Sequence, residues 1–217
     1  MYNLVMKDLR IGINPWFLAL PFLAGALMLI PGWIYFVVLQ YFLWISVPNI
    51  FGQFKAQNDL LFTTAIPVSR EVIVKARVTV IVLLELLHVG VAMIFSVFTF
   101  HLYPNMKYFF FAPHLGFWGL CFVMLAIFNV IFIPMYYKTA YKYGFAVTAS
   151  IAAVILYSAG AQWLGIQNAY IFDMFNGSGA DHTFLHLSIL IAGIAIFAIS
   201  TVVACRIAIK RFEKVDI

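Results

Sequence analysis

The sequence predicts an all-α, polytopic membrane protein in which residues 1–217 form a single transmembrane domain. Of the 217 residues, 65% are hydrophobic and 10% are charged, and the mean hydropathy is +1.02, so the chain is far more apolar than a soluble core requires. A bilayer core about 30 Å thick takes roughly 20 apolar residues per helix, which allows about six spans with short connections. Runs such as 189–205 are apolar on every side instead of alternating, which favours helices over barrel strands.

The N-terminal segment predicts an interfacial helix over residues 1–11. Asn3, Lys7 and Arg10 are spaced by four and three residues, so they form a polar stripe on a helix whose other faces are mostly apolar. Such a helix lies on the membrane surface rather than across it.

Six spans are predicted from the apolar runs that follow: 16–30, 33–54, 78–101, 114–137, 143–164 and 184–206. Asn14 and Pro15 have the pattern of an N-cap followed by proline at the first helical position. Pro31 and Gly32 form a tight turn between the first two spans, and Pro48 removes a backbone donor and kinks the second. Residues 165–183 are rich in Asn, Asp and Gly and are predicted to form a loop.

The distribution of cations predicts the orientation. Of the 13 Lys and Arg residues, only Lys107 falls on the opposite side from all the others. The positive-inside tendency therefore places both termini and residues 55–77 in the cytoplasm. The excess of cations also suits anionic lipid, and it requires no nucleic-acid partner. No cleavable signal peptide is apparent.

Catalytic motifs are missing from the sequence. No phosphate-binding GxxxxGK[ST] loop is present, so this chain cannot hydrolyse ATP by that route. His182 and His186 have the spacing of two metal ligands beside Asp181, but the HExxH base is absent, and a solvated helix start is the simpler interpretation. Residues 176–179 lack the first glycine of a GxSG protease turn. The sequence thus predicts no enzymatic activity, metal or cofactor for this chain by itself.

Glu85 is the only acidic residue well inside a predicted span, where a carboxylate costs about 2.5–3.5 kcal/mol on insertion scales. His88 follows one turn later on the same face, where the two can share a proton or a hydrogen bond. Two interpretations remain open. The residues form a polar lining of a translocation path or subunit interface, or they form a structural pair that faces Gln40, Asn129 or another polar group.

Small residues in the last two spans predict close helix packing within the bundle, with a dimer interface as the alternative. They are Ala149, Ala153 and Gly160 in the fifth span and Ser188, Ala192 and Ala195 in the sixth.

Residues 55–77 are the only sizeable charged segment between long apolar runs. The pattern predicts a short interfacial helix, a break, and a second helix that re-enters the membrane. The residues that define it are Asn58 and Asp59 at the polar start, Leu61 and Phe62 in an apolar knob, Pro67 at the break, Ser69 as N-cap, and Arg70 at the start of the second helix.

This arrangement resembles the cytoplasmic coupling region of ABC-2 (ATP-binding-cassette type 2) transporter permeases, particularly the small six-span branch that includes the phenol-soluble-modulin exporter permeases of bacteria. The resemblance rests on Asn58, Asp59, Leu61, Phe62, the run 66–70 (IPVSR) and the run 73–77 (IVKAR). A second match is the run 134–138 (PMYYK) at the end of the fourth span. Thr139 and Ala140 depart from the glycine-containing turn expected after it.

The resemblance implies a permease subunit of an ATP-driven exporter in the bacterial cell membrane. A separate cytoplasmic nucleotide-binding ATPase would hold ATP and Mg, and a second permease, identical or a paralogue, would complete the transporter. The cargo would be a peptide or another amphipathic or hydrophobic substrate. A secondary carrier and a non-transport membrane scaffold or immunity protein are the alternatives.

The resemblance also implies which residues meet the ATPase through the coupling helix: Asn58, Asp59, Leu61, Phe62, Pro67, Ser69, Arg70, Tyr137 and Lys138. Phe62 would be the apolar anchor and Arg70 an interface cation, because aromatic and Arg residues dominate interface energetics. The simpler interpretations are an aromatic ring in the lipid interface for Phe62 and a contact with solvent or lipid phosphate for Arg70.

Overall fold

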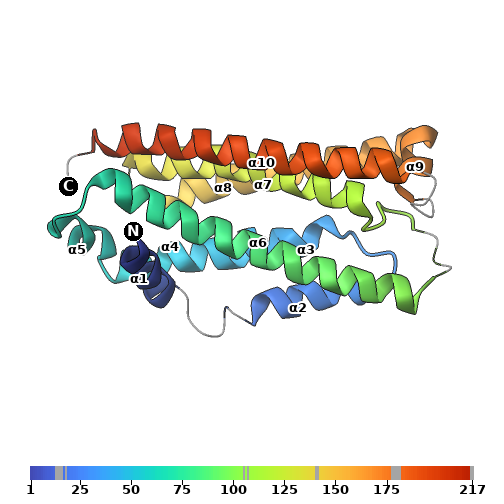
Figure 1. Ribbon diagram of the computed structural model, residues 1–217, viewed down its shortest axis with the longest axis horizontal. Coiled ribbons are helices and arrows are strands. Elements are labelled where there is room, and N and C mark those ends of the chain that lie inside the picture. Colours follow the sequence, from blue (N-terminus) through green and yellow to red (C-terminus); the bar gives the residue numbers. More distant parts are fainter. Residues whose placement is uncertain are drawn as a thin grey trace.

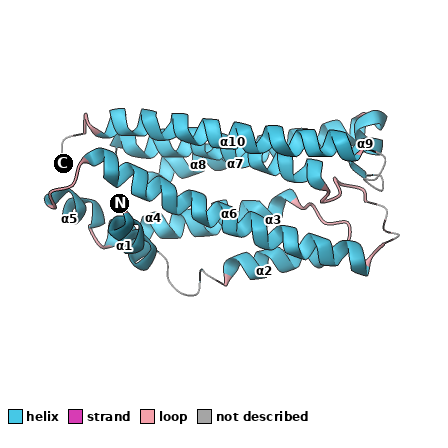
Figure 2. Ribbon diagram, in the orientation of Figure 1, coloured by secondary structure: helices cyan, strands magenta, loops and turns pink. Residues whose placement is uncertain are grey.

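The computed structural model describes residues 1–12, 17, 19–104, 106, 108–139, 142–176 and 182–215. These residues contain helices, turns and loops, and no strand (Figure 2). Several predicted features lie outside the described residues: the start of the first span at residues 14–16, Lys107, Ala140 in the short link, and residues 177–181, which include Asp181.

The long helices run side by side in two groups (Figure 1). One group contains α7 (Leu115–Thr139), α8 (Tyr143–Gln167) and α10 (Thr183–Phe212), and the other contains α6 (Arg70–Leu102), α3 (Phe36–Tyr41), α4 (Val47–Ala56) and α2 (Leu20–Ala26). The backbones of α7 and α10 approach most closely at Gly119 and Gly193, where an added Cβ atom would lie 2.4 Å or less from the opposite backbone. Glycine is required there because no side chain fits.

Large aromatic side chains fill the space between the two groups. Phe51 of α4 packs edge-on against Phe132 and Tyr136 of α7, with ring centroids 4.8 and 4.6 Å apart. The ring of Phe36 of α3 lies 4.8 Å from that of Phe117 of α7, in a tilted arrangement. The abundance of phenylalanine therefore has a structural use, since the rings bridge helices whose backbones stay apart.

Among the described residues, five helical segments are long and apolar enough to cross a membrane, and the predicted all-helical fold is confirmed for this part of the chain. They are Phe36–Ala56, Arg70–Leu102, Leu115–Thr139, Tyr143–Gln167 and Thr183–Phe212. The predicted first span corresponds to a shorter apolar helix, Leu20–Leu29, in which α2 continues into a 3₁₀ turn (Leu27–Leu29). Six spans therefore stay a prediction.

The second span is continuous from Phe36 to Ala56 but contains a π-helical turn, Phe42–Ser46, immediately before Pro48. Proline has no N–H to continue the α-helical ladder, and a wider turn accommodates the missing bond. The predicted turn at Pro31 and Gly32 is also present, with Gly32 at a φ of +72°.

Two predictions about the last third of the chain were wrong. The segment 169–176 is a helix, α9 (Ala169–Asn176), because Asn168 caps it by accepting hydrogen bonds from the backbone N–H groups of Tyr170 and Ile171. The face of α10 with Ser188, Ala192 and Ala195 is exposed and does not pack inside the bundle.

One end of the bundle carries two short helices that are not part of any candidate span. Helix α1 (Tyr2–Gly12) crosses α4 and α6, and α5 (Asp59–Ala65) lies at the tip beyond the end of α4 (Figure 1). The predicted N-terminal helix is confirmed, as is the order of short helix, break and long helix over residues 59–102. This end contains most of the residues proposed from the sequence for a partner contact.

Candidate functional site

Helix α5 begins directly after a sharp reversal of the chain at Asn58. Asn58 has the left-handed backbone angles φ 49° and ψ 32°, which asparagine tolerates better than most residues. The reversal separates α5 from α4 and gives it two distinct faces. Asp59, Leu60 and Thr63 are buried, whereas the side chains of Leu61 and Phe62 are 50% and 64% exposed.

The buried face of α5 is held by an ionic group that we call the α1–α5 ion cluster, formed by Lys7, Asp8, Asp59 and Arg77. Arg77 is almost completely buried, and its Nε and Nη2 atoms donate to the two carboxylate oxygens of Asp8 at 3.1 and 3.3 Å. The same Nη2 atom donates to Asp59. The guanidinium thus joins α1 and α5 to α6 through two carboxylates at once, an arrangement that the planar arginine fork favours.

Lys7 completes the cluster from α1. Its Nζ atom lies 2.6 Å from Asp59 Oδ1, 2.6 Å from Thr63 Oγ1 and 3.1 Å from Asp8 Oδ1. Two cations therefore face two carboxylates, and the cluster carries no net charge. Because buried charges are stable only when paired and hydrogen-bonded, this balance allows four charged groups to occupy the interior.

The surroundings of Asp59 fix its ionisation. Burial alone would raise its pKa, but the charge of Arg77 and the hydrogen bonds from Lys7 and Arg77 lower the pKa below its ordinary value of 3.8. Arg77 also lies over the ring of Phe54, 3.9 Å from its centroid, and donates to the hydroxyl of Tyr136 at 3.5 Å. Asp59 is therefore a carboxylate committed to contacts inside the chain, and its side chain does not face outward.

The predicted helix cap at Ser69 is confirmed, because its hydroxyl accepts from the backbone N–H of Val72 at 3.4 Å. Pro67 is exposed in the break between the two helices. Arg70, the next residue proposed for the contact, donates from Nη1 to the carbonyls of Phe212, Glu213 and Val215 at 2.8–3.0 Å. It binds the last turn of α10, where carbonyls lack helical partners and the helix dipole favours a cation.

A groove of about 410 Å³ lies between α5 and the start of α6. Its lining consists of Leu61, Thr64, Ala65, Val68, Arg70 and Ile73. The groove combines apolar side chains with one cation, and Leu61 lines it, while the exposed ring of Phe62 is the next residue along α5.

The second predicted contact, at the end of α7, is divided between the interior and the surface. Tyr137 is buried, with its ring 5.2 Å from that of Phe212, while Lys138 is exposed. Of this pair only Lys138 presents its side chain to a partner.

Glu85 and His88 lie inside the bundle and do not bond to each other. Glu85 Oε2 accepts from Asn129 Nδ2 at 3.0 Å, and the same amide group donates to Thr201 Oγ1 at 3.2 Å. We call these three residues the central polar cluster. His88 Nδ1 lies 2.7 Å from the carbonyl of Leu84. Asn129 was one of the partners expected for Glu85, whereas Gln40 bonds to Ser158 at 2.6 Å instead.

The histidine pair near the start of α10 forms no metal centre within the described residues. His182 is exposed, His186 is buried, and no group of three His, Cys, Asp or Glu side chains that could hold a metal occurs in that part of the chain.

Sequence reasoning missed the cluster beneath α5 because it overlooked Asp8. Leu4, Asp8 and Gly12 are spaced by four residues, and the last two are buried, so Asp8 lies on the inner face of α1. A carboxylate on an otherwise apolar face requires a buried cation, and this is the signal that could have pointed to Arg77.

The fold and the site together define a polytopic helical membrane protein that presents an anchored, partly exposed helix at one end of its bundle. A family model described as "ABC-2 family transporter protein" matches residues 3–208. The chain therefore belongs to the ABC-2 family of transporter membrane proteins, and the match runs from α1 through α5 and all five long helices. Comparison with curated proteins and with solved structures gave no match.

Proposed function

We propose that this chain is the permease subunit of an ATP-driven exporter and that α5 is the coupling helix through which a separate nucleotide-binding ATPase acts on it. The observation that carries the proposal is the asymmetry of α5. One face is fixed to α1 and α6 by the α1–α5 ion cluster, and the other exposes Leu61 and Phe62.

This asymmetry suits a helix that transmits force. A movement imposed on Leu61 and Phe62 would be passed to α6 through Asp59 and Arg77, because the ionic contacts leave α5 little freedom to move alone. Since α6 spans 33 residues without interruption, a displacement at Arg70 would extend across the bundle. An exposed aromatic ring such as that of Phe62 is also the usual form of an interface anchor.

The remaining parts of the proposal follow from the family and from the positions of the cations. Leu20–Leu29 and the residues before it would form the short first of six spans. The end that bears α1 and α5 would face the cytoplasm of a bacterial cell, since nearly all Lys and Arg residues belong to that side by the positive-inside tendency.

The ATPase would bind ATP and Mg, and a second permease subunit, identical or a paralogue, would complete the transporter. The exposed small residues of α10, Ser188, Ala192 and Ala195, suit such a helix contact. The substrate would be a peptide or another amphipathic molecule, as in the modulin exporter branch. Glu85 and His88, buried within one copy of the chain, would serve a path only if the bundle opens around them.

Co-purification tests the docking of the ATPase. The tagged chain is solubilised from its native membrane, and the ATPase recovered with it is measured for wild type and for Phe62→Ala. We expect about a tenfold loss or more, because truncating a central interface aromatic costs 2 kcal/mol or more. The amount of chain in the membrane should stay unchanged, since the Phe62 ring is mostly exposed.

Phe145 provides the matched control. It is an exposed aromatic near the start of α8, two residues after Tyr143, whose hydroxyl approaches Gly52 near the end of α4. Phe145→Ala should leave the recovery of the ATPase unchanged. Equal recovery with Phe62→Ala and wild type, or no ATPase with the wild-type chain, would contradict the proposal.

A further inference from the structure

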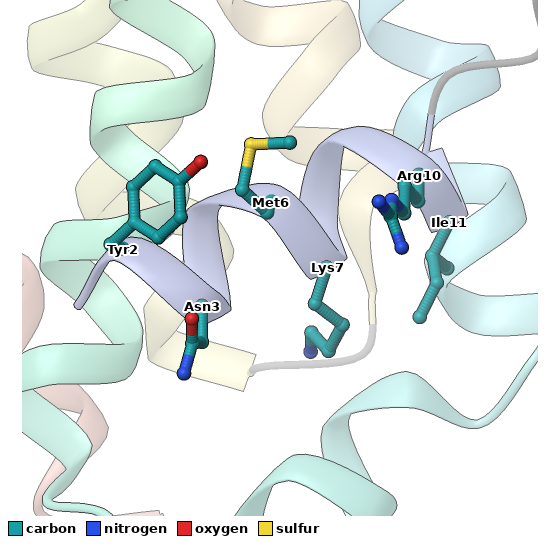
Figure 3. Close-up of a pocket in the computed structure, with 6 residues that line it drawn as sticks. All are labelled: Tyr2, Asn3, Met6, Lys7, Arg10 and Ile11. Atoms are coloured by element: carbon teal, nitrogen blue, oxygen red, sulfur yellow. The ribbon is translucent and has the colours of Figure 1, made fainter.

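A second surface at the same end of the molecule has no assigned role, namely the outward face of α1. Two parallel rows of side chains form a groove of about 450 Å³ on this face (Figure 3). One row is Tyr2, Met6 and Arg10, and the other is Asn3, Lys7 and Ile11. Residues four apart stack into ridges on a helix, so the groove follows directly from the sequence spacing.

The groove carries a positive charge at Arg10 that is not balanced by a nearby carboxylate in the described part of the chain. Arg10 is exposed, and no hydrogen bond or ion pair among the described residues involves its guanidinium. The carboxylate nearest in sequence, Asp8, points to the inner side of α1 and is bound by Arg77. The outward face of α1 therefore offers one cation, Arg10, that no carboxylate of the described residues neutralises, whereas the Nζ atom of Lys7 is already bound by Asp59 and Asp8.

The position of α1 places this groove at a membrane surface. Gly12 packs against Phe54 and Ile50, so α1 crosses α4 in the last two turns of α4. The apolar run of α4 ends close by, at Lys55. Figure 3 shows Tyr2 and Met6 on the side of α1 toward the middle of the bundle, and Asn3 and Lys7 on the side toward α5. Arg10 belongs to the row that begins with Tyr2 and Met6, so the cation lies beside apolar side chains, as on a helix at a membrane interface.

We infer that the groove on α1 binds the headgroup of an anionic glycerophospholipid, with Arg10 contacting its phosphate. The Arg10 guanidinium matches phosphate oxygens, and Tyr2 and Met6 lie in the same row, where the start of an acyl chain would pass. A free phosphate ion would use only the cation and leave the apolar row uncovered.

Lys7 links this site to α5. Its stem lines the groove, while its Nζ atom bonds to Asp59 and Thr63 of α5 at 2.6 Å each. Only the Lys7 side chain separates a phosphate bound beside Arg10 from the rest of the α1–α5 ion cluster. Binding in the groove and the position of α5 are therefore coupled. The binding site itself requires only that the chain is embedded in a membrane, and it does not depend on an ATPase.

The test measures lipid binding to the purified full-length chain in a neutral detergent. Native mass spectrometry reports the occupancy during titration with phosphatidylglycerol, with phosphatidylcholine of the same acyl chains, and with inorganic phosphate. We expect phosphatidylglycerol to bind most tightly and Arg10→Gln to weaken it about fivefold, the usual contribution of one cation near an acidic surface. Arg10→Lys should retain most of the affinity.

Arg206→Gln is the control, because Arg206 is an exposed arginine in the last two turns of α10, near enough to Lys75 of α6 for their charges to interact. It removes the same charge outside the groove and should change the affinity less than about twofold. Equal weakening by Arg10→Gln and Arg206→Gln would overturn the inference, as would equal binding of phosphatidylcholine or equal occupancy by inorganic phosphate. Since no ATPase takes part, this result stands apart from the test of docking.

Discussion

The four charges of the α1–α5 ion cluster are paired with one another, whereas the buried carboxyl group in the middle of the bundle has no cation partner in the described part of the chain. In the α1–α5 ion cluster, two cations and two carboxylates join three helices. In the central polar cluster, Glu85 receives one hydrogen bond from Asn129, and its Oε1 atom has no hydrogen-bond partner within the described residues. Both groups are buried, but their chemistry differs.

The difference shows what each cluster can contribute. Paired charges fix the relative positions of α1, α5 and α6, because moving any of them separates ions in an apolar setting. A single carboxyl group bonded to an amide fixes only the contact of α6 with α7 and can be replaced by any group that accepts the same bond. The first cluster is therefore suited to transmitting movement, and the second, which joins α6, α7 and α10 through Asn129, to specifying how these helices pack.

Removing the shared cation is expected to have the largest effect. Arg77→Ala leaves Asp8 and Asp59 buried without their main partner, and such losses cost about 3–5 kcal/mol. A thermal melt of the purified protein in detergent measures the change. Lys75→Ala, two residues earlier on α6, is the control, because Lys75 pairs only with Glu71 at the surface and should have little effect. Similar melting temperatures for the two variants would show that the cluster is not a structural anchor.

Variants of Glu85 are expected to separate charge from hydrogen bonding in the central polar cluster. Glu85→Gln keeps an oxygen that accepts from Asn129 and should melt at or above the wild-type temperature. Glu85→Ala leaves the amide with only Thr201 as partner and should lose about 1–3 kcal/mol. If Gln destabilises as much as Ala, the charge itself is required, and the two clusters are more alike than the contacts indicate.

Acid is expected to have the smallest effect until the pH becomes very low. The pKa of Asp59 is lower in the folded chain than its ordinary value of 3.8, so its contribution is complete above that value and is lost as the pH falls through the folded pKa. The difference in melting temperature between wild type and Asp59→Asn should stay constant from pH 8 to about pH 5. A difference that vanishes between pH 6 and pH 5 would mean that the carboxylate is not held by Lys7 and Arg77.

The sequence predicted the helices better than the contacts between them. Apolar runs and caps located the long helices, and the pattern around Ser69 correctly gave the start of α6 at Arg70. The exposed pair Leu61 and Phe62 also follows from the local pattern, since an apolar knob in a polar segment has no span to join.

Contacts between distant residues could not be predicted in the same way. Asp8 and Arg77 are 69 positions apart, and no local spacing connects them. Arg70 was expected to face a partner or lipid, but the end of α10 returns to it and supplies three carbonyl groups. Helix α9 was missed because its glycine-rich surroundings outweighed its apolar residues and the capping side chain of Asn168. Tertiary contacts decided the first two cases, and a local helix cap decided the third.

Cross-linking from α5 tests whether this helix is the coupling helix that meets the ATPase. A photo-reactive phenylalanine analogue replaces Phe62, or Phe145 as control, and native membranes are irradiated with and without ATP. We expect position 62 to capture a nucleotide-binding ATPase, with a yield that changes when ATP is present, and position 145 to capture none. Capture of lipid alone at position 62, or equal capture of the ATPase at both positions, would contradict the assignment of α5 as the coupling helix.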